Sequence, residues 1–171
     1  MTSRARSCSS RDAAGAPGLR VGVWVLPNDL AAELSTSAND TYITPSLLSQ
    51  ATVFEYMRRG AFEPHLEELT GKLKARRDTM VAALERHLPD VSFGRPDGGI
   101  FLQLKLAPGT DAKQAVARAE GVTVLPGADF GGFPHTLRLN YAEPALEEIE
   151  PGIERLAAAL ALEPAVFEGF D

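Results

Sequence analysis

The sequence predicts a domain of the α/β or α+β class, ordered as one strand, then helices, then a mixed sheet with helices. Three patterns support this. A short apolar run rich in valine at 21–26 closes on Pro27, which is typical of a buried strand. Apolar residues recur at three- and four-residue steps over 61–88, as on one face of a helix. Alternating apolar residues over 100–106 indicate a strand with one buried face.

The first half of the chain is expected to turn from strand to helix. Turn-forming residues over 37–45, "SANDTYITP", predict a loop. Ser46 can cap a helix that runs to about Arg59 and ends at the following glycine. The long helix expected over 61–88 is weakened in its middle by Gly71, at a cost of about 1 kcal/mol relative to alanine. Its apolar stripe consists of Leu66, Leu69, Leu73, Met80, Leu84 and Leu88.

The second half of the chain changes period after Pro89. The segment 91–106 reads as two strands joined by a turn. A short helix is expected near 111–120, and strands are expected at 122–125 and 136–141. A loop rich in glycine and proline separates the last two strands. These elements predict a small sheet with a helix inserted between its strands.

The chain is expected to end in one helix rather than two. Apolar residues form a single stripe from Leu146 to Leu160. Pro151 lies inside this segment, where proline removes a backbone donor and destabilises a helix by about 3 kcal/mol. Because the stripe continues in phase through the proline, the pattern predicts one kinked helix.

Composition excludes several classes of protein. With 171 residues, 44% of them hydrophobic, the chain can form one core. A net charge of -6 argues against nucleic acid as a partner, and no apolar run approaches the roughly 20 residues that cross a membrane. The single cysteine, Cys8, excludes an internal disulfide and fits a cytoplasmic location. Residues 1–16, rich in arginine and serine, are expected to form a disordered tail.

The residues best suited to chemistry are two arginines. Arg20 follows a glycine- and proline-rich turn, where a planar guanidinium beside backbone N–H groups can bind a phosphate. Arg138 lies between Leu137 and Leu139, so in a strand it points away from both. It can bind a carboxylate through two parallel hydrogen bonds, or it can be an outward residue in water. The residue pattern leaves both readings open.

The histidines give no sign of a metal site. His65, His87 and His135 are far apart in the sequence and lack the short spacing of metal ligands. The sequence therefore predicts no metal centre.

Five segments carry a resemblance when they are taken together and in order. They are "PGLRVG", "RRDTMVAAL", "PDGGIFLQL", "GVTVLPGADFG" and "LRLNY". This series resembles the C-terminal part of class I/II aminotransferases, the fold-type I enzymes that use pyridoxal phosphate. The nearest subgroup includes 2-aminoadipate and aromatic aminotransferases and the MocR-like regulators.

The resemblance implies a division of the chain into four parts. Residues 1–16 would be a tail outside the family. Residues 17–60 would be a remnant of the large-domain strand and helix. Residues 61–88 would form the interdomain helix, and 89–171 the α+β small C-terminal domain.

The resemblance also implies roles for both arginines. Arg138 corresponds to the arginine that binds the substrate α-carboxylate, and Arg20 to the one that contacts the cofactor phosphate. The implied activity is transfer of an amino group between an amino acid and a 2-oxo acid, with pyridoxal 5'-phosphate as cofactor. A homodimer, or a separate chain that supplies the large domain, is the implied partner.

The family's Schiff-base lysine has no counterpart in this sequence. It belongs to a Ser-X-Ser-Lys motif just before the proline-glycine turn, where this chain reads "SCSSRDAAGAPG" and places Asp12 or Ala13. Neither side chain can form an imine, and the chemistry requires a positioned amine. The four lysines lie far downstream, at Lys72, Lys74, Lys105 and Lys113. The sequence therefore predicts no catalytic residue and no activity of the chain alone.

Three hypotheses remain open at this stage. The chain is the C-terminal part of an aminotransferase, truncated by a miscalled start or a frameshift. Alternatively, it is a non-catalytic module that binds a carboxylate or complements a partner chain. Finally, it is the ligand-sensing tail of a MocR-like regulator, although no helix-turn-helix is visible. In each case the strand at 21–26 would expose apolar surface and favour self-association.

Overall fold

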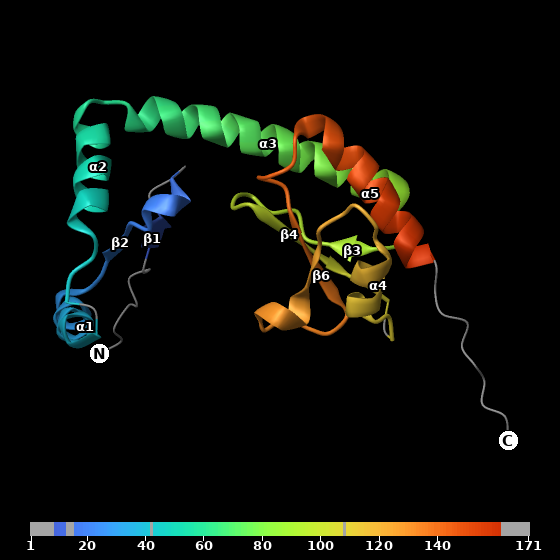
Figure 1. The fold of residues 1–171 in the computed structure, drawn as a ribbon, viewed down its shortest axis with the longest axis horizontal. Helices are drawn as coiled ribbons and strands as arrows, with labels where there is room; N and C mark the ends of the chain where they lie inside the picture. Colours follow the sequence, from blue (N-terminus) through green and yellow to red (C-terminus); the bar gives the residue numbers. More distant parts are fainter. Residues whose placement is uncertain (1–8, 13–15, 42, 108, 162–171) are drawn as a thin grey trace, which may run out of the picture. The chain divides into compact units, whose positions relative to one another are not determined.

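The computed structural model describes residues 9–12, 16–41, 43–107 and 109–161 (Figure 1). The chain divides into two compact units, Met1–Thr70 and Gly71–Asp171. The boundary falls within the long helix α3 (Phe62–His87), which confirms the helix expected over 61–88. Gly71, expected to weaken this helix, is the first residue of the second unit.

A two-stranded antiparallel sheet begins the first unit. Strand β2 (Gly22–Val25) forms where the apolar run predicted it, and it pairs with β1 (Ser9–Asp12). A short 3₁₀ turn, η1 (Pro17–Leu19), lies between the two strands. The expectation of a disordered tail is thus wrong at Ser9–Asp12, because a backbone ladder satisfies N–H and C=O groups whatever the side chains are. Residues 1–8 and 13–15 lie outside the described residues.

Helix α1 (Asn28–Thr41) was not expected, and the loop predicted over 37–45 is wrong at 37–41. The serine and threonine side chains of this segment bond within the helix rather than forming a turn. The hydroxyl of Ser35 donates to the carbonyl of Ala31 at 2.7 Å, and that of Thr41 donates to Ser37 at 2.9 Å. Because these hydroxyls bond to carbonyls one turn earlier, they are accommodated within the helix.

Helix α2 (Leu47–Arg58) confirms the capping prediction. The Ser46 side chain accepts a hydrogen bond from the backbone N–H of Ser49, which satisfies one of the unpaired donors of the first turn. The helix ends before Gly60, whose φ of +69° is the left-handed conformation that glycine adopts easily.

Large apolar side chains of the first unit are exposed. Leu48 is 79% exposed, Phe54 67% and Val25 70%, and neither α1 nor α2 contains a buried residue among those described. The side chain of Trp24 lies outside the described residues. Apolar surface of this kind favours association, so self-association remains a prediction.

The second unit contains a four-stranded sheet. Its order is β3 (Ser92–Phe93), β4 (Phe101–Lys105), β6 (Thr136–Asn140) and β5 (Leu125–Pro126), and each neighbouring pair is antiparallel. This confirms the strands expected over 91–106 and 136–141 and makes the unit α+β. The sheet is antiparallel rather than mixed.

The strand expected at 122–125 begins only at Leu125. The preceding residues close the end of α4 (Ala112–Arg118), where the N–H of Val122 donates to the carbonyl of Ala119 at 3.2 Å. Gly121 has a φ of +70° in this turn. The backbone groups of Val122 are thus used by the turn rather than by the sheet.

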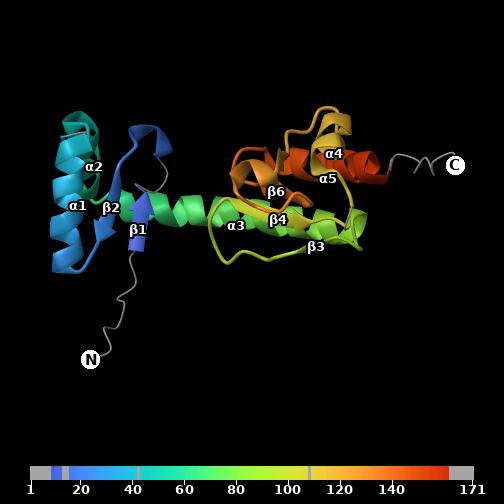
Figure 2. The same cartoon turned by 90° about the horizontal axis from the view of Figure 1, so that it is seen from below.

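Two helices cover one face of the sheet (Figures 1 and 2). They are the C-terminal half of α3 and α5 (Leu146–Ala161), and α4 packs against α5 and β5. Helix α5 is continuous through Pro151, as predicted. The core contains Met80, Leu84, Leu102, Leu104, Leu137, Leu139, Ile149, Ile153 and Leu156.

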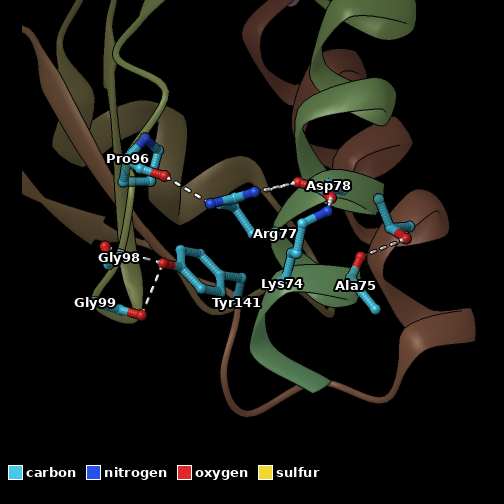
Figure 3. Close-up of polar contacts among 9 residues, drawn as sticks. Lys74, Ala75, Arg77, Asp78, Pro96, Gly98, Gly99 and Tyr141 are labelled. Carbon is cyan, nitrogen blue, oxygen red and sulfur yellow. Dashed lines mark hydrogen bonds and ion pairs between the residues drawn. The ribbon is translucent and has the colours of Figure 1, made fainter. Parts of the chain in front are cut away.

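The loop between β3 and β4 is fastened to the rest of the unit by Tyr141 (Figure 3). This buried side chain donates a hydrogen bond to the carbonyl of Gly99 at 2.8 Å and lies 3.3 Å from the carbonyl of Gly98. Burial raises the pKa of the phenol, and the positive charge of Arg77 opposes that rise. The neutral phenol is therefore the form that the fold stabilises.

Arg77 on α3 fastens the same loop from the helix side (Figure 3). Its guanidinium donates to the carbonyl of Pro96 at 3.1 Å and contacts the carboxylate of Asp78 at 2.7 Å. Lys74 reaches the other carboxylate oxygen of Asp78 at 2.7 Å. Hydrogen bonds from Lys74 and Arg77 lower the pKa of Asp78, so this carboxylate stays charged over a wide pH range.

We expect the substitution Tyr141→Phe to lower the free energy of unfolding by about 1 kcal/mol at neutral pH, because hydrogen bonding to the loop is lost. The native phenol has a raised pKa, so its stabilisation is complete below the unfolded-state pKa of about 10 and is lost as the pH rises through the folded-state value. The advantage of the native protein over the variant should therefore shrink above about pH 10.

Urea denaturation of both proteins at several pH values measures this difference. Tyr56→Phe, at a residue that is 38% exposed, serves as the control. A difference in stability that stays constant across the alkaline range would contradict the prediction.

Candidate functional site

The face of the sheet opposite the helices carries the candidate site. Leu137 and Leu139 are buried in the core, so the alternation of β6 places Arg138 on the other face, as the sequence predicts. In the sheet register, Arg138 is paired with Gln103 on β4 and with Leu125 on β5. The guanidinium is thus carried by an inner strand of the sheet, where the backbone is held on both sides.

Two aromatic rings flank the guanidinium of Arg138, which is half-buried. Its Cζ atom lies 3.5 Å from the ring centroid of Phe101 and 4.6 Å from that of Phe130. These are cation–π distances, and they restrict the orientation of the planar group. Within the described part of the chain, no carboxylate forms an ion pair with Arg138. The positive charge is held by apolar rings rather than neutralised.

A glycine turn brings Phe130 to this position. The 3₁₀ turn η2 (Gly127–Phe130) packs against β6 because Gly127 has no side chain. A Cβ at this residue would lie 1.9 Å from the hydroxyl oxygen of Thr136. The turn closes through a hydrogen bond from the N–H of Gly132 to the carbonyl of Gly127 at 2.8 Å. Close backbone approach therefore explains Gly127 and Gly132, which have near neighbours at the position of a Cβ.

A cavity of about 650 Å³ lies beside Arg138. It extends from the strands to the first turns of α5, and its volume is in the range of small-molecule sites. Its lining includes three acidic residues, Glu143, Glu147 and Glu148. The side chain of Glu148 accepts a hydrogen bond from the N–H of Ala145 at 2.9 Å, so this acid caps the helix. Two arginines, Arg138 and Arg155, therefore line the cavity together with three acidic residues.

Arg20 lies in the first unit, between η1 and β2. It is exposed, and its φ of +54° is uncommon for a residue other than glycine. Arg138 belongs to the second unit, and each unit is described by itself. The cofactor-phosphate role of Arg20 stays a prediction.

Sequence reasoning missed the two phenylalanines around Arg138. Phe101 could have been found, because it is paired with Asn140, two residues from Arg138 and on the same face of β6. Side chains alternate between the two faces of a sheet, so the alternation of two paired strands predicts which side chains share a face. Phe130 lies in a loop, and no local pattern indicates where its ring points.

The described residues form no helix with both the length and the apolar character needed to span a membrane.

The second unit has an α+β fold and an arginine on the open face of its sheet, which agrees with the α+β fold class that the sequence motifs imply. The family model described as "Aminotransferase class I and II" matches residues 7–156, and the chain belongs to this family. The match begins ahead of Pro17, so residues 7–16, expected to lie outside the family, fall within it. This agrees with the pairing of β1 and β2.

Related proteins include enzymes and regulators. The chain is 32% identical over 153 residues to aromatic-amino-acid aminotransferase 1 of Thermococcus litoralis, covering 85% of this chain and 36% of that protein. It is 34% identical over 150 residues to the 2-aminoadipate transaminase of Thermus thermophilus, covering 84% and 38%. It is also 33% identical over 144 residues to the uncharacterized HTH-type transcriptional regulator YdfD of Bacillus subtilis, covering 82% and 30%. The chain thus spans little more than a third of these proteins at most.

Solved structures agree with this assignment. The α-aminoadipate aminotransferase LysN of Thermus thermophilus, complexed with N-(5'-phosphopyridoxyl)-L-leucine, is 32% identical and superposes with a TM-score of 0.77. The match covers 85% of this chain and 39% of that structure. The kynurenine aminotransferase of Pyrococcus horikoshii is 31% identical, with a TM-score of 0.78. The described fold is therefore part of a fold-type I aminotransferase architecture.

The residues present do not fit a covalently held pyridoxal phosphate. All four lysines are described and exposed, and none lines the cavity beside Arg138. Lys74 contacts Asp78 at 2.7 Å, and Lys113 contacts Asp129 at 3.2 Å. At the expected motif, Asp12 lies in β1 and pairs with Gly22, and Ala13 lies outside the described residues. Among the described residues, no lysine amine is positioned to form an imine in this cavity.

We expect Gly127→Ala to destabilise the protein by about 1–3 kcal/mol, because the new methyl group overlaps the side chain of Thr136. Gly152→Ala is the matched control. Gly152 lies inside α5 with open space around it, and alanine there should stabilise the helix by roughly 0.5–1 kcal/mol. Urea denaturation measures both changes. Equal stability of Gly127→Ala and the native chain would show that η2 does not pack closely on β6.

Proposed function

We propose that the second unit provides the substrate-carboxylate side of an aminotransferase-type site, in which Arg138 binds the α-carboxylate of an amino acid or 2-oxo acid. The observation that carries the proposal is the guanidinium of Arg138 held between Phe101 and Phe130. Among the described residues, no acid forms an ion pair with it. A ligand carboxylate would complete this arrangement.

The physical basis is a charge-assisted pair of parallel hydrogen bonds. A guanidinium matches a carboxylate in shape, and two N–H groups can donate to the two oxygens at once. The aromatic rings orient the guanidinium and lower its exposure to water, which strengthens an electrostatic contact. The cavity beside Arg138 accommodates the rest of a small ligand. Three of its lining residues are acidic, and two, Arg138 and Arg155, are basic, so a zwitterionic ligand would find partners for both of its charges.

In this proposal the chain binds and orients substrate but does not transfer the amino group by itself. Amino transfer requires an amine at the cofactor carbon, and no lysine of the sequence stands at the motif before Pro17. A second copy or a separate chain would have to supply the cofactor domain, and Arg20 would contact the cofactor phosphate in such an assembly. The single cysteine supports a cytoplasmic setting.

The experiment on Arg138 uses 4-methyl-2-oxopentanoate, the 2-oxo acid that corresponds to leucine. We expect the native chain to bind this acid in calorimetric titration and not to bind its methyl ester, which lacks the charge. Arg138→Gln should abolish binding. Arg138→Lys should weaken it roughly tenfold, because it keeps the charge but loses the planar fork.

Arg58→Gln is the matched control, since it removes one positive charge from α2, where Arg58 pairs with Glu55 at 2.7 Å. Binding by this variant should be unchanged. Equal affinity of the native chain and Arg138→Gln for the acid would overturn the carboxylate role.

A second experiment tests the absence of imine chemistry. We expect pyridoxal phosphate mixed with the chain, then reduced with borohydride, to give only slow and scattered labelling of lysines. Peptide mapping by mass spectrometry measures the labelled positions. Rapid modification of one lysine in stoichiometric amount, with the absorbance band of an imine, would contradict the proposal that the chain alone is inactive.

A ligand-sensing role in a regulator is the alternative. Its support is the 33% identity to YdfD over 82% of this chain. Both roles use the same carboxylate site, so binding does not separate them. The transcript that contains the codon for Met1 separates them. An adjoining frame that encodes a helix-turn-helix ahead of a cofactor domain favours the regulator, and a cofactor domain without a helix-turn-helix favours the enzyme.

A further inference from the structure

A second group of chemically active side chains lies where α3 and α5 run side by side (Figures 1 and 2). His87, the last residue of α3, faces Glu150 and Glu154 of α5. The Nε2 atom of His87 lies 3.3 Å from Oε1 of Glu150 and 3.6 Å from Oε1 of Glu154. The three potential ligand atoms all lie within 4.8 Å of one another.

The packing of the two helices holds this group together. Glu150 and Glu154 are four residues apart on α5, so they share one face of the helix. One turn before His87, Leu84 is fully buried, and Ile153 of α5 is buried in the same core. The histidine and the two carboxylates are therefore carried by rigid, well-packed backbone rather than by loops.

The donor set and its spacing suit zinc. Imidazole nitrogen and carboxylate oxygen bind Zn²⁺ at about 2.0–2.2 Å in a tetrahedral arrangement, which separates neighbouring donors by about 3.3–3.5 Å. The distance from His87 to Glu150, 3.3 Å, falls within this range, and the distance to Glu154, 3.6 Å, is slightly longer. We propose that His87, Glu150 and Glu154 bind one Zn²⁺ ion, with water in the fourth position, and that the ion joins the C-terminal end of α3 to α5.

Arg86 is the competing partner in this group. Its guanidinium contacts the same Oε1 atom of Glu150, and its side chain is 60% exposed. A metal ion and this guanidinium would compete for one carboxylate oxygen. The proposal therefore requires that removal of Arg86 strengthen Zn²⁺ binding, whereas a simple ion-pair cluster of histidine and acids makes no such demand.

The sequence predicted no metal centre because it compared the histidines with one another. His87 and Glu150 are separated by 63 residues, and no spacing rule connects them. The fold brings them together across two helices.

The test uses the full chain without an affinity tag and with Cys8→Ser, so that the single thiol cannot bind metal. Titration with Zn²⁺ in the presence of a chromophoric chelator should show one site. Co²⁺ in place of Zn²⁺ should give the intense visible absorption of a tetrahedral complex. His87→Gln and Glu154→Gln should each lower the association constant by roughly tenfold or more, and Arg86→Gln should raise it.

His65→Gln is the control, because this histidine lies on the part of α3 that belongs to the first unit. The affinity of this variant for Zn²⁺ should equal that of the native chain. Glu154 is 56% exposed, so its variant should fold even if His87→Gln does not. The absence of saturable binding, or binding unaffected by Glu154→Gln and Arg86→Gln, would show an ion-pair cluster only and overturn the proposal.

Discussion

Burial of one leucine face of the sheet is the constraint on which the second unit depends. Leu104 of β4 and Leu137 of β6 are fully buried against α3 and α5. The residues that alternate with these leucines along each strand must therefore face the other way. A register slip of one residue would expose the leucines and turn the guanidinium of Arg138 into the core. Burial of an unpaired charge is strongly unfavourable. The position of the candidate site thus follows from hydrophobic packing on the opposite face.

Recognition of a carboxylate and chemistry on an amine have different structural requirements. Recognition needs one oriented guanidinium, which a strand, the ring of Phe101 and the ring of Phe130 provide within one unit. Amine chemistry needs a lysine at one defined point, and the lysines of this chain lie on exposed positions of α3, β4 and α4. The proposed function therefore rests on the first requirement alone, and no described lysine meets the second.

Much of the fold could be predicted because its signals are local. The cap at Ser46, the stripe of α3 and the alternation around Leu104 each depend on neighbours a few residues away. The elements that the sequence did not predict have several causes. Hydroxyls such as that of Ser35 bond back into α1, and strand β1 depends on a partner in β2 whose pairing no composition reveals. Val122 looked like a strand residue, but the turn after α4 uses its backbone.

The sequence by itself determined the parity of Arg138, the lack of a lysine before Pro17 and the family, because periodicity and motif order are properties of the linear chain. Only the tertiary structure decided that Phe130 covers the guanidinium and that His87 meets Glu150. Those contacts join residues on different elements. Their approach is set by how helices and strands pack, which depends on the shape of the whole core rather than on any local pattern.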